Sequence, residues 1–266
     1  MASEVSLQGM KKAVFFPFRG KNSTDKILIG AAIYFANFII PLIPFILLLD
    51  YFGQIMKRII VLDLDPQMPE WNDWGTFFID GLRIFGALVI YTLPGVLVMI
   101  FGYFLIFGTS FVMSFLGSFF TLAFSNGNAP SPLPIFFTTL TSIVGSLAGF
   151  LIIWIGLIIS LISGVFYQPA MGHLIARGDF GAAFRFKEWW PVFKANLGGY
   201  LLTTIFALGF VIFLSFFIQF LYLTVVLCIL LPFVISILGF IIESAVYSLY
   251  AIAYRDGVRQ LTGKAV

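Results

Sequence analysis

The sequence from residue 140 to residue 165 reads LTSIVGSLAGFLIIWIGLIISLISGV and contains no charged side chain. About 20 consecutive apolar residues are enough for an α-helix to cross the hydrocarbon core of a bilayer, so this stretch predicts a membrane-spanning helix. Small residues recur along it at helical spacing, and they are Ser142, Gly145, Gly149, Gly156, Ser160 and Gly164. Small residues let two helix backbones approach closely, which predicts a tightly packed neighbouring helix. We expect Ser110, Ser114 and Ser118, in the preceding apolar stretch, to form the facing surface.

The absence of charge extends well beyond this stretch. Asp, Glu, Lys and Arg are missing from residues 27–49, 84–176 and 195–242. Of the 266 residues 61% are hydrophobic and 10% charged, whereas soluble domains have about 25% charged residues. We therefore expect an all-α protein, a polytopic transmembrane helix bundle of about six spans with short amphipathic interfacial helices. The expected spans are near residues 27–49, 84–106, 109–124, 140–165, 197–222 and 232–254.

Several function classes are excluded or disfavoured by composition. The net charge of +3 is spread along the chain without a dense basic block, so we expect no nucleic-acid partner. Cys228 is the only cysteine and His173 the only histidine, which leaves no thiol or histidine cluster for a metal. No phosphate-binding glycine loop or nucleophile elbow occurs. We expect no enzyme activity, no catalytic residues, no cofactor and no metal.

Tryptophans gather in two polar segments that interrupt the apolar sequence. Trp71 and Trp74 lie in residues 69–83, PEWNDWGTFFIDGLR, and Trp189 and Trp190 lie in residues 166–196. Amphipathic rings concentrate at the membrane surface, so all four are predicted interfacial anchors. Residues 1–26 mix apolar and basic side chains and are expected to form an interfacial segment as well.

The distribution of Lys and Arg predicts the orientation. With six spans, the positive-inside rule places the N-terminus, residues 166–196 and the C-terminus in the cytoplasm, and residues 50–83 outside. Pro41 and Pro44 leave a second possibility open, because proline kinks helices and the first span can turn back as a re-entrant hairpin. Both polar segments then face the cytoplasm.

The order of spans and polar segments suggests an internal repeat. Glu70 and Trp71 precede one span as Glu188 and Trp189 precede another. A single transmembrane domain over residues 27–254 would then contain two halves of three spans each, 27–124 and 140–254, inverted as in many transporters. With a re-entrant first span the repeat is parallel instead. We expect residues 255–266 to form a basic tail.

The sequence between residues 27 and 95 also resembles a known family. The matching stretches are ILIG from Ile27, DYFG from Asp50, PEWNDW from Pro69, FIDGL from Phe78 and YTLP from Tyr91. They are similar to a prokaryotic family of multi-pass integral membrane proteins, the domain of unknown function of the 4013 type. Family members commonly carry Gly-Tyr where residues 50–53 stand here. The resemblance implies a multi-pass protein in the cell membrane of a bacterium or archaeon and brings no activity with it.

Three further polar features were considered as sites. Glu243 lies inside the last apolar segment, where an ionisable group indicates either a functional polar site or an inter-helix hydrogen bond. His173 is either a ligand of haem or a chlorin, or a hydrogen-bonded interfacial residue. Acidic side chains within residues 61–73 either bind a hard cation or form a solvated loop; they are Asp63, Asp65, Glu70 and Asp73.

Two functions fit these observations. In the first, the protein is a structural or accessory subunit that packs against other membrane-protein subunits, or against itself, within membrane lipids. In the second, it is a carrier for a neutral or lipid-like small molecule built from two inverted halves. Ion-coupled transport usually needs intramembrane charge, and its near absence favours the accessory role.

Overall fold

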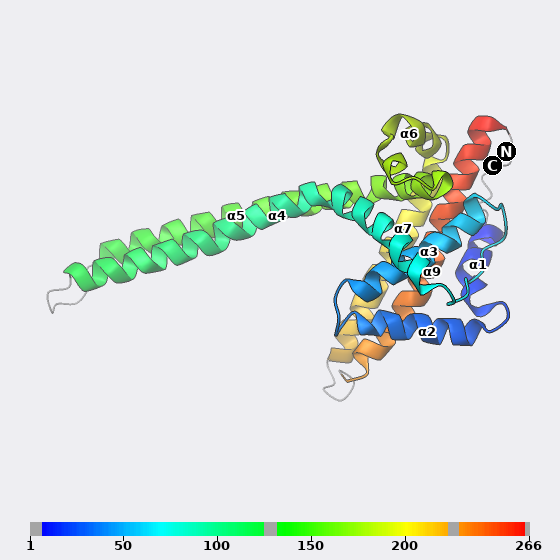
Figure 1. Ribbon diagram of the computed structural model, residues 1–266. Helices are drawn as coiled ribbons and strands as arrows, with labels where there is room; N and C mark the ends of the chain where they lie inside the picture. Colours follow the sequence, from blue (N-terminus) through cyan, green and yellow to red (C-terminus); the bar gives the residue numbers. More distant parts are fainter. Residues whose placement is uncertain (1–6, 125–131, 223–228, 264–266) are drawn as a thin grey trace. The chain divides into compact units, whose positions relative to one another are not determined.

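The computed structural model describes residues 7–124, 132–222 and 229–263 (Figure 1). The expected all-α class is confirmed, since this part of the chain contains helices and no strand. In chain order the helices are α1 (Leu7–Phe15), η1 (Phe16–Phe18), α2 (Ser23–Ala36), α3 (Ile43–Ile60), α4 (Trp74–Phe124), α5 (Pro132–Arg177), η2 (Phe180–Phe184), α6 (Phe186–Ala195), α7 (Leu197–Tyr222) and α9 (Leu231–Thr262).

Within the described ranges, four helices are long and apolar enough to cross a membrane: α4, α5, α7 and α9. The predicted count of about six spans is therefore not confirmed. The difference arises at two places in the first half of the sequence.

The first difference is the stretch predicted as a span over residues 27–49, which consists of two helices. α2 ends at Ala36 and α3 begins at Ile43, with Leu42 between them in a left-handed conformation, φ +76°. Pro41 and Pro44 lack the backbone N–H that a continuous helix needs there. The 14 residues of α2 extend about 21 Å, too short for a hydrocarbon core of about 30 Å. α2 and α3 pack on each other and on α9, and a re-entrant course of this segment stays a prediction.

The second difference is that residues 84–106 and 109–124 belong to one helix. α4 continues through Gly102 and Gly108 for 51 residues and contains Pro94. Glycine lowers helix stability by about 1 kcal/mol but does not end a helix when its missing side chain serves packing. Gly102 is such a residue, since it lies against the backbone of Gly149 in α5.

The chain divides into two compact units. The first contains Met1–Leu88 and Tyr167–Val266, and the second contains Val89–Phe166. These units do not coincide with the proposed halves 27–124 and 140–254, and the internal repeat stays a prediction.

The first unit is organised around α9, on which α1, α2, α3, α6 and α7 all pack. Close approach is possible because small residues of α9 lie at the contacts. A Cβ atom at Gly239 would lie 2.8 Å from the ring of Tyr34 in α2, and one at Gly257 would lie 2.5 Å from the carbonyl oxygen of Val192 in α6. Phe240 of α9 is fully buried, and its ring contacts Gly30 of α2.

The second unit is an antiparallel pair formed by the later part of α4 and the earlier part of α5, which run side by side in Figure 1. Its small residues meet in successive layers: Gly95 against Gly156 and Ser160, Gly102 against Gly149, and Thr109 against Gly145. Gly95, Gly102 and Thr109 are seven residues apart, so they lie on one face of α4.

Two details of this pairing differ from the sequence expectation. The surface of α4 that faces Gly145, Gly149, Gly156 and Ser160 is formed by Gly95, Gly102 and Thr109 rather than by the three serines. Of those serines, Ser114 and Ser118 line a shallow groove beside Thr138 instead. Gly164 takes no part in the pairing, because a Cβ atom there would meet nothing within 4 Å.

The pairing predicts opposite effects for two glycine-to-alanine changes in α5. In Gly149→Ala the new Cβ would lie 2.6 Å from the carbonyl oxygen of Gly102, so backbone must move, and we expect a loss of roughly 1–3 kcal/mol of stability. Gly164→Ala has free space and gains helix propensity, so its melting temperature should stay the same or rise. Thermal unfolding in mild detergent measures both, and equal melting temperatures for the two variants would contradict the close pairing.

Candidate functional site

The polar segments of the first unit are joined to one another by ion pairs. Asp63, in the loop between α3 and α4, lies 3.4 Å from the guanidinium of Arg255 and 2.5 Å from that of Arg259, both in α9. Asp63 has a left-handed backbone, φ +53°, which the short polar side chain tolerates. The loop is therefore attached to the C-terminal end of α9.

The same loop is attached to the N-terminal segment. Asp65 lies 3.7 Å from Lys12 of α1, and Glu70 lies 2.6 Å from Lys26 of α2. Lys26 is buried, and its Nζ also donates a hydrogen bond to the carbonyl oxygen of Met68 at 3.1 Å. An ion pair with a buried partner is screened less by solvent than an exposed one.

The four acidic residues that were considered as a cation site thus have separate partners. Asp63, Asp65 and Glu70 pair with cations of α9, α1 and α2 respectively. Asp73 accepts hydrogen bonds from the hydroxyl and the backbone N–H of Thr76 at the start of α4. The first three carboxylates therefore link the loop to other helices, and Asp73 caps the start of α4.

Trp71 and Trp74 lie in an aromatic stack beside this loop. The ring of Trp71 stacks on Tyr51 at 4.0 Å and on Trp74 at 5.6 Å, and its Nε1 donates to the carbonyl oxygen of Lys26. Trp71 is half-buried and Trp74 is 46% exposed, so Trp74 presents the larger surface to the surroundings. Their role as interfacial anchors stays a prediction.

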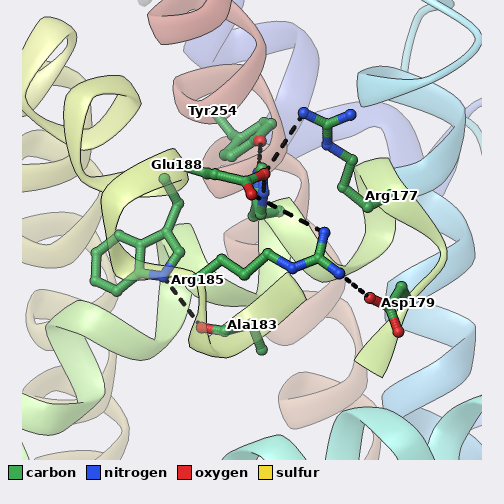
Figure 2. A network of polar contacts seen from close by, with 8 residues as sticks. Arg177, Asp179, Ala183, Arg185, Glu188 and Tyr254 are labelled. Carbon is green, nitrogen blue, oxygen red and sulfur yellow. Dashed lines mark hydrogen bonds and ion pairs between the residues drawn. The ribbon is translucent and has the colours of Figure 1, made fainter. Parts of the chain in front are cut away.

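Glu188 and Trp189 lie in the first turn of α6, whereas Glu70 and Trp71 lie in the loop before α4. His173 of α5 lies with Nε2 3.0 Å from the Glu188 carboxylate and with Nδ1 2.7 Å from the hydroxyl of Tyr254. Figure 2 shows Arg177 and Arg185 reaching Glu188 as well, at 3.5 and 4.0 Å. Arg185 also binds Asp179 at 2.7 Å.

Both ring nitrogens of His173 are therefore engaged, and the side chain is buried. With the proton on Nε2, the ring donates to Glu188 and accepts from Tyr254. A haem or chlorin would have to displace one of these partners. The arrangement fits the hydrogen-bonded interpretation of His173 better than a ligand role.

The two tryptophans of α6 differ in their surroundings. Trp189 is 1% exposed and donates from Nε1 to the carbonyl oxygen of Ala183, so it lies in the protein interior. Trp190 is half-buried, stacks on Phe186 and Phe193, and carries Lys194 over its ring at 5.1 Å. Of the two, only Trp190 is accessible enough to contact the membrane interface.

Glu243 connects two helices. Its carboxylate accepts a hydrogen bond from the hydroxyl of Tyr34 at 3.1 Å, which joins α9 to α2. This is the inter-helix hydrogen bond that was one of the two interpretations of Glu243.

A cavity of about 320 Å³ lies in the first unit among α3, the start of α4 and the end of α5. Its volume is at the lower end of the range of small-molecule sites, about 300–1,000 Å³. Five charged side chains line it: Asp50, Lys57, Arg58, Asp80 and Arg83. Sequence reasoning did not single them out, although one signal was available, since Arg83 directly precedes the long uncharged stretch.

The charges in this cavity are unevenly paired. Arg83 binds Asp80 at 2.7 Å, and Asp50 accepts a hydrogen bond from Gln54 at 2.9 Å. Nε of Arg58 is buried and has no hydrogen-bond partner in the described part of the chain. Asp50 is also buried, and this burial raises the pKa of its carboxyl to about 6, while Gln54 opposes the shift.

The raised pKa of Asp50 predicts a pH-dependent contribution to stability. Because the folded pKa of about 6 exceeds the unfolded value of 3.8, this stability is fully present below pH 3.8 and is lost as the pH rises through 6. We expect Asp50→Asn to gain roughly 3 kcal/mol on the wild type between pH 4 and pH 7. Thermal unfolding of both proteins at several pH values measures this difference.

Asp73→Asn is the matched control for this measurement. Hydrogen bonds from Thr76 lower the pKa of the exposed Asp73 carboxyl, so its contribution has the opposite sign and is lost as the pH falls. A difference between Asp50→Asn and wild type that does not change with pH would show that Asp50 ionises normally in the fold.

No curated protein and no solved structure is similar enough to this sequence to match it. One family model, described as a protein of unknown function (DUF4013), matches residues 33–223. The match covers more than half of the chain and includes α3 to α7, with the charged cavity. The chain therefore belongs to the DUF4013 family.

Proposed function

We propose that this protein is an accessory subunit of a membrane-protein complex in the cell membrane of a bacterium or archaeon. The α4–α5 pair of the second unit is its docking element. A carrier for a neutral or lipid-like molecule is the second candidate.

The observation that carries the proposal is the apolar length of this pair. From residue 89 to its end at Phe124, α4 extends about 54 Å at a rise of about 1.5 Å per residue, and no position in it is charged. The hydrocarbon core is about 30 Å thick. A tilt of about 40°, the upper end of the usual range, still leaves roughly 41 Å along the membrane normal. Lipid tails cannot cover that length, whereas an apolar surface of another protein can.

The side chains on this surface fit protein contact. Phe104, Phe107, Phe111 and Phe115 are each more than 60% exposed and lie three or four residues apart, on one face of α4. The small residues of α4 face α5 instead, so the phenylalanines point away from the partner helix. Aromatic rings contribute much of the binding energy of buried interfaces, and a row of four rings provides a large apolar contact surface.

Photo-crosslinking in intact cells tests the docking role. A benzophenone amino acid at Phe111, which is 74% exposed, should give discrete protein adducts, because this position is expected to lie in an interface. The matched position is Phe213 in α7, which is 64% exposed and is expected to face lipid. Native mass measurement after mild-detergent purification then identifies the partner, and an adduct of twice the chain mass identifies a second copy. Lipid adducts alone at both positions, together with a monodisperse monomer, would refute the accessory role.

We also infer the topology from the ion pairs. Two charged groups in direct contact lie on the same side of a membrane, and the loop at Asp63 and Asp65 contacts both the start and the end of the chain. These pairs favour four spans, α4, α5, α7 and α9, with the α2–α3 hairpin returning to the side it entered from. The Lys and Arg residues of the described ranges then all lie on one side, which the positive-inside rule identifies as the cytoplasm. The six-span alternative leaves Lys57, Arg58 and Arg83 outside.

Cysteine labelling tests this topology. In a Cys228→Ser background, a cysteine at Asn72 should react with a membrane-impermeant maleimide only after the cells are opened, since this exposed position would be cytoplasmic. A cysteine at Leu133, 64% exposed in the first turn of α5, should react in intact cells. Reaction at position 72 in intact cells would restore the six-span arrangement.

Glu243 is the residue on which the carrier interpretation depends. Its hydrogen bond to Tyr34 is the kind of contact that holds helices together, so it gives no independent support to transport. For this reason the accessory role is preferred.

A further inference from the structure

We propose that the charged cavity among α3, α4 and α5 binds a phosphate-bearing anion, with the headgroup of an anionic phospholipid as its natural source. This site is independent of the docking role of the second unit. It uses residues of the first unit only.

The first argument is the pairing of the charges. Lys57 and Arg58 both line the cavity, and the buried Nε of Arg58 has no hydrogen-bond partner among the described residues. By contrast, Arg83 is held by Asp80, and Asp50 is held by Gln54. A buried guanidinium nitrogen without a partner is costly, and an anion entering the cavity would provide the missing acceptor.

The second argument is the depth of the site. The cavity is lined by Arg83 and Ile84, where the charged part of α4 ends, and by Ile175 and Gly178, on either side of the point where charge returns in α5 at Arg177. Both helices thus pass from apolar to polar at the cavity. That boundary is where headgroups lie, and basic pockets between helices on the cytoplasmic side bind anionic headgroups.

The third argument is the mixed lining. Leu62, Ile84, Leu174 and Ile175 add apolar surface next to the cations. A free inorganic anion makes no apolar contact with such surface, whereas the glycerol and first acyl carbons of a phospholipid can pack against it. The combination favours a lipid over a soluble phosphate.

Lipid binding to the purified protein tests the site. The delipidated full-length chain is offered phosphatidylglycerol, phosphatidylcholine or inorganic phosphate, and bound molecules are counted by native mass spectrometry. We expect retention of phosphatidylglycerol over phosphatidylcholine, and a loss of roughly tenfold or more in its affinity in Lys57→Gln/Arg58→Gln. Retention of inorganic phosphate at similar concentration would also support the site and would identify a soluble phosphate as its source.

Lys11→Gln/Lys187→Gln is the matched control, because it removes the same charge from exposed side chains that do not line the cavity. It should bind like the wild type. Arg58→Lys keeps the cation and should retain most of the binding, so a folding defect of the double glutamine variant can be recognised. Equal loss in the control pair, or no preference of the wild type for phosphatidylglycerol or inorganic phosphate over phosphatidylcholine, would overturn the proposal.

Discussion

The close packing of helices on α9 is the constraint on which the first unit depends. Lipid tails are as apolar as the helix surfaces, so helices in a membrane associate through van der Waals contact and hydrogen bonds rather than through exclusion of water. α9 meets this requirement with small residues at its contacts, such as Gly239 and Gly257. α1, α2, α3, α6 and α7 pack on it, and the Glu243–Tyr34 hydrogen bond adds a polar link.

This packing also gathers the charges of distant segments. Asp63 reaches Arg255 and Arg259 because the loop that carries it follows α3, which lies along α9. Glu188 of α6 likewise contacts His173, which lies in α5. Ion pairs thus connect charged groups from distant segments of the first unit, while the long stretches 84–176 and 195–242 carry no charge. The charged cavity lies where these two parts of the sequence meet.

The second unit follows the same packing rule with fewer contacts. Gly95, Gly102 and Thr109 pack against small residues of α5, which accounts for one face of each helix. The remaining faces are covered with exposed Phe, Leu and Ile side chains. The proposed accessory role rests on the length of this unit, whose apolar surface is longer than the hydrocarbon core of about 30 Å.

Much of the architecture followed from the sequence alone. The uncharged stretches determined that the protein is all-α and has helices able to span a membrane, because only helices satisfy their backbone hydrogen bonds locally in lipid. The glycines at 145, 149 and 156 indicated a close helix pair, because small residues let two helix backbones approach each other. The partner surface, the break of the first span at Leu42 and the continuity of α4 through Gly108 required the tertiary structure. Hydropathy does not distinguish a broken helix from a continuous one.

The charged contacts between distant segments were decided by tertiary structure, whereas pairs such as Asp80 with Arg83 are three residues apart in the sequence. Asp63 and Arg259 are almost 200 positions apart, and no local pattern links them. The cavity likewise joins Arg58 to Arg83 and Ile175, which the sequence places in three separate segments. Sequence determined where charge is permitted, because burying an unpaired charge in lipid is costly. Only the fold decided which charges meet, because that depends on which helices lie side by side around α9.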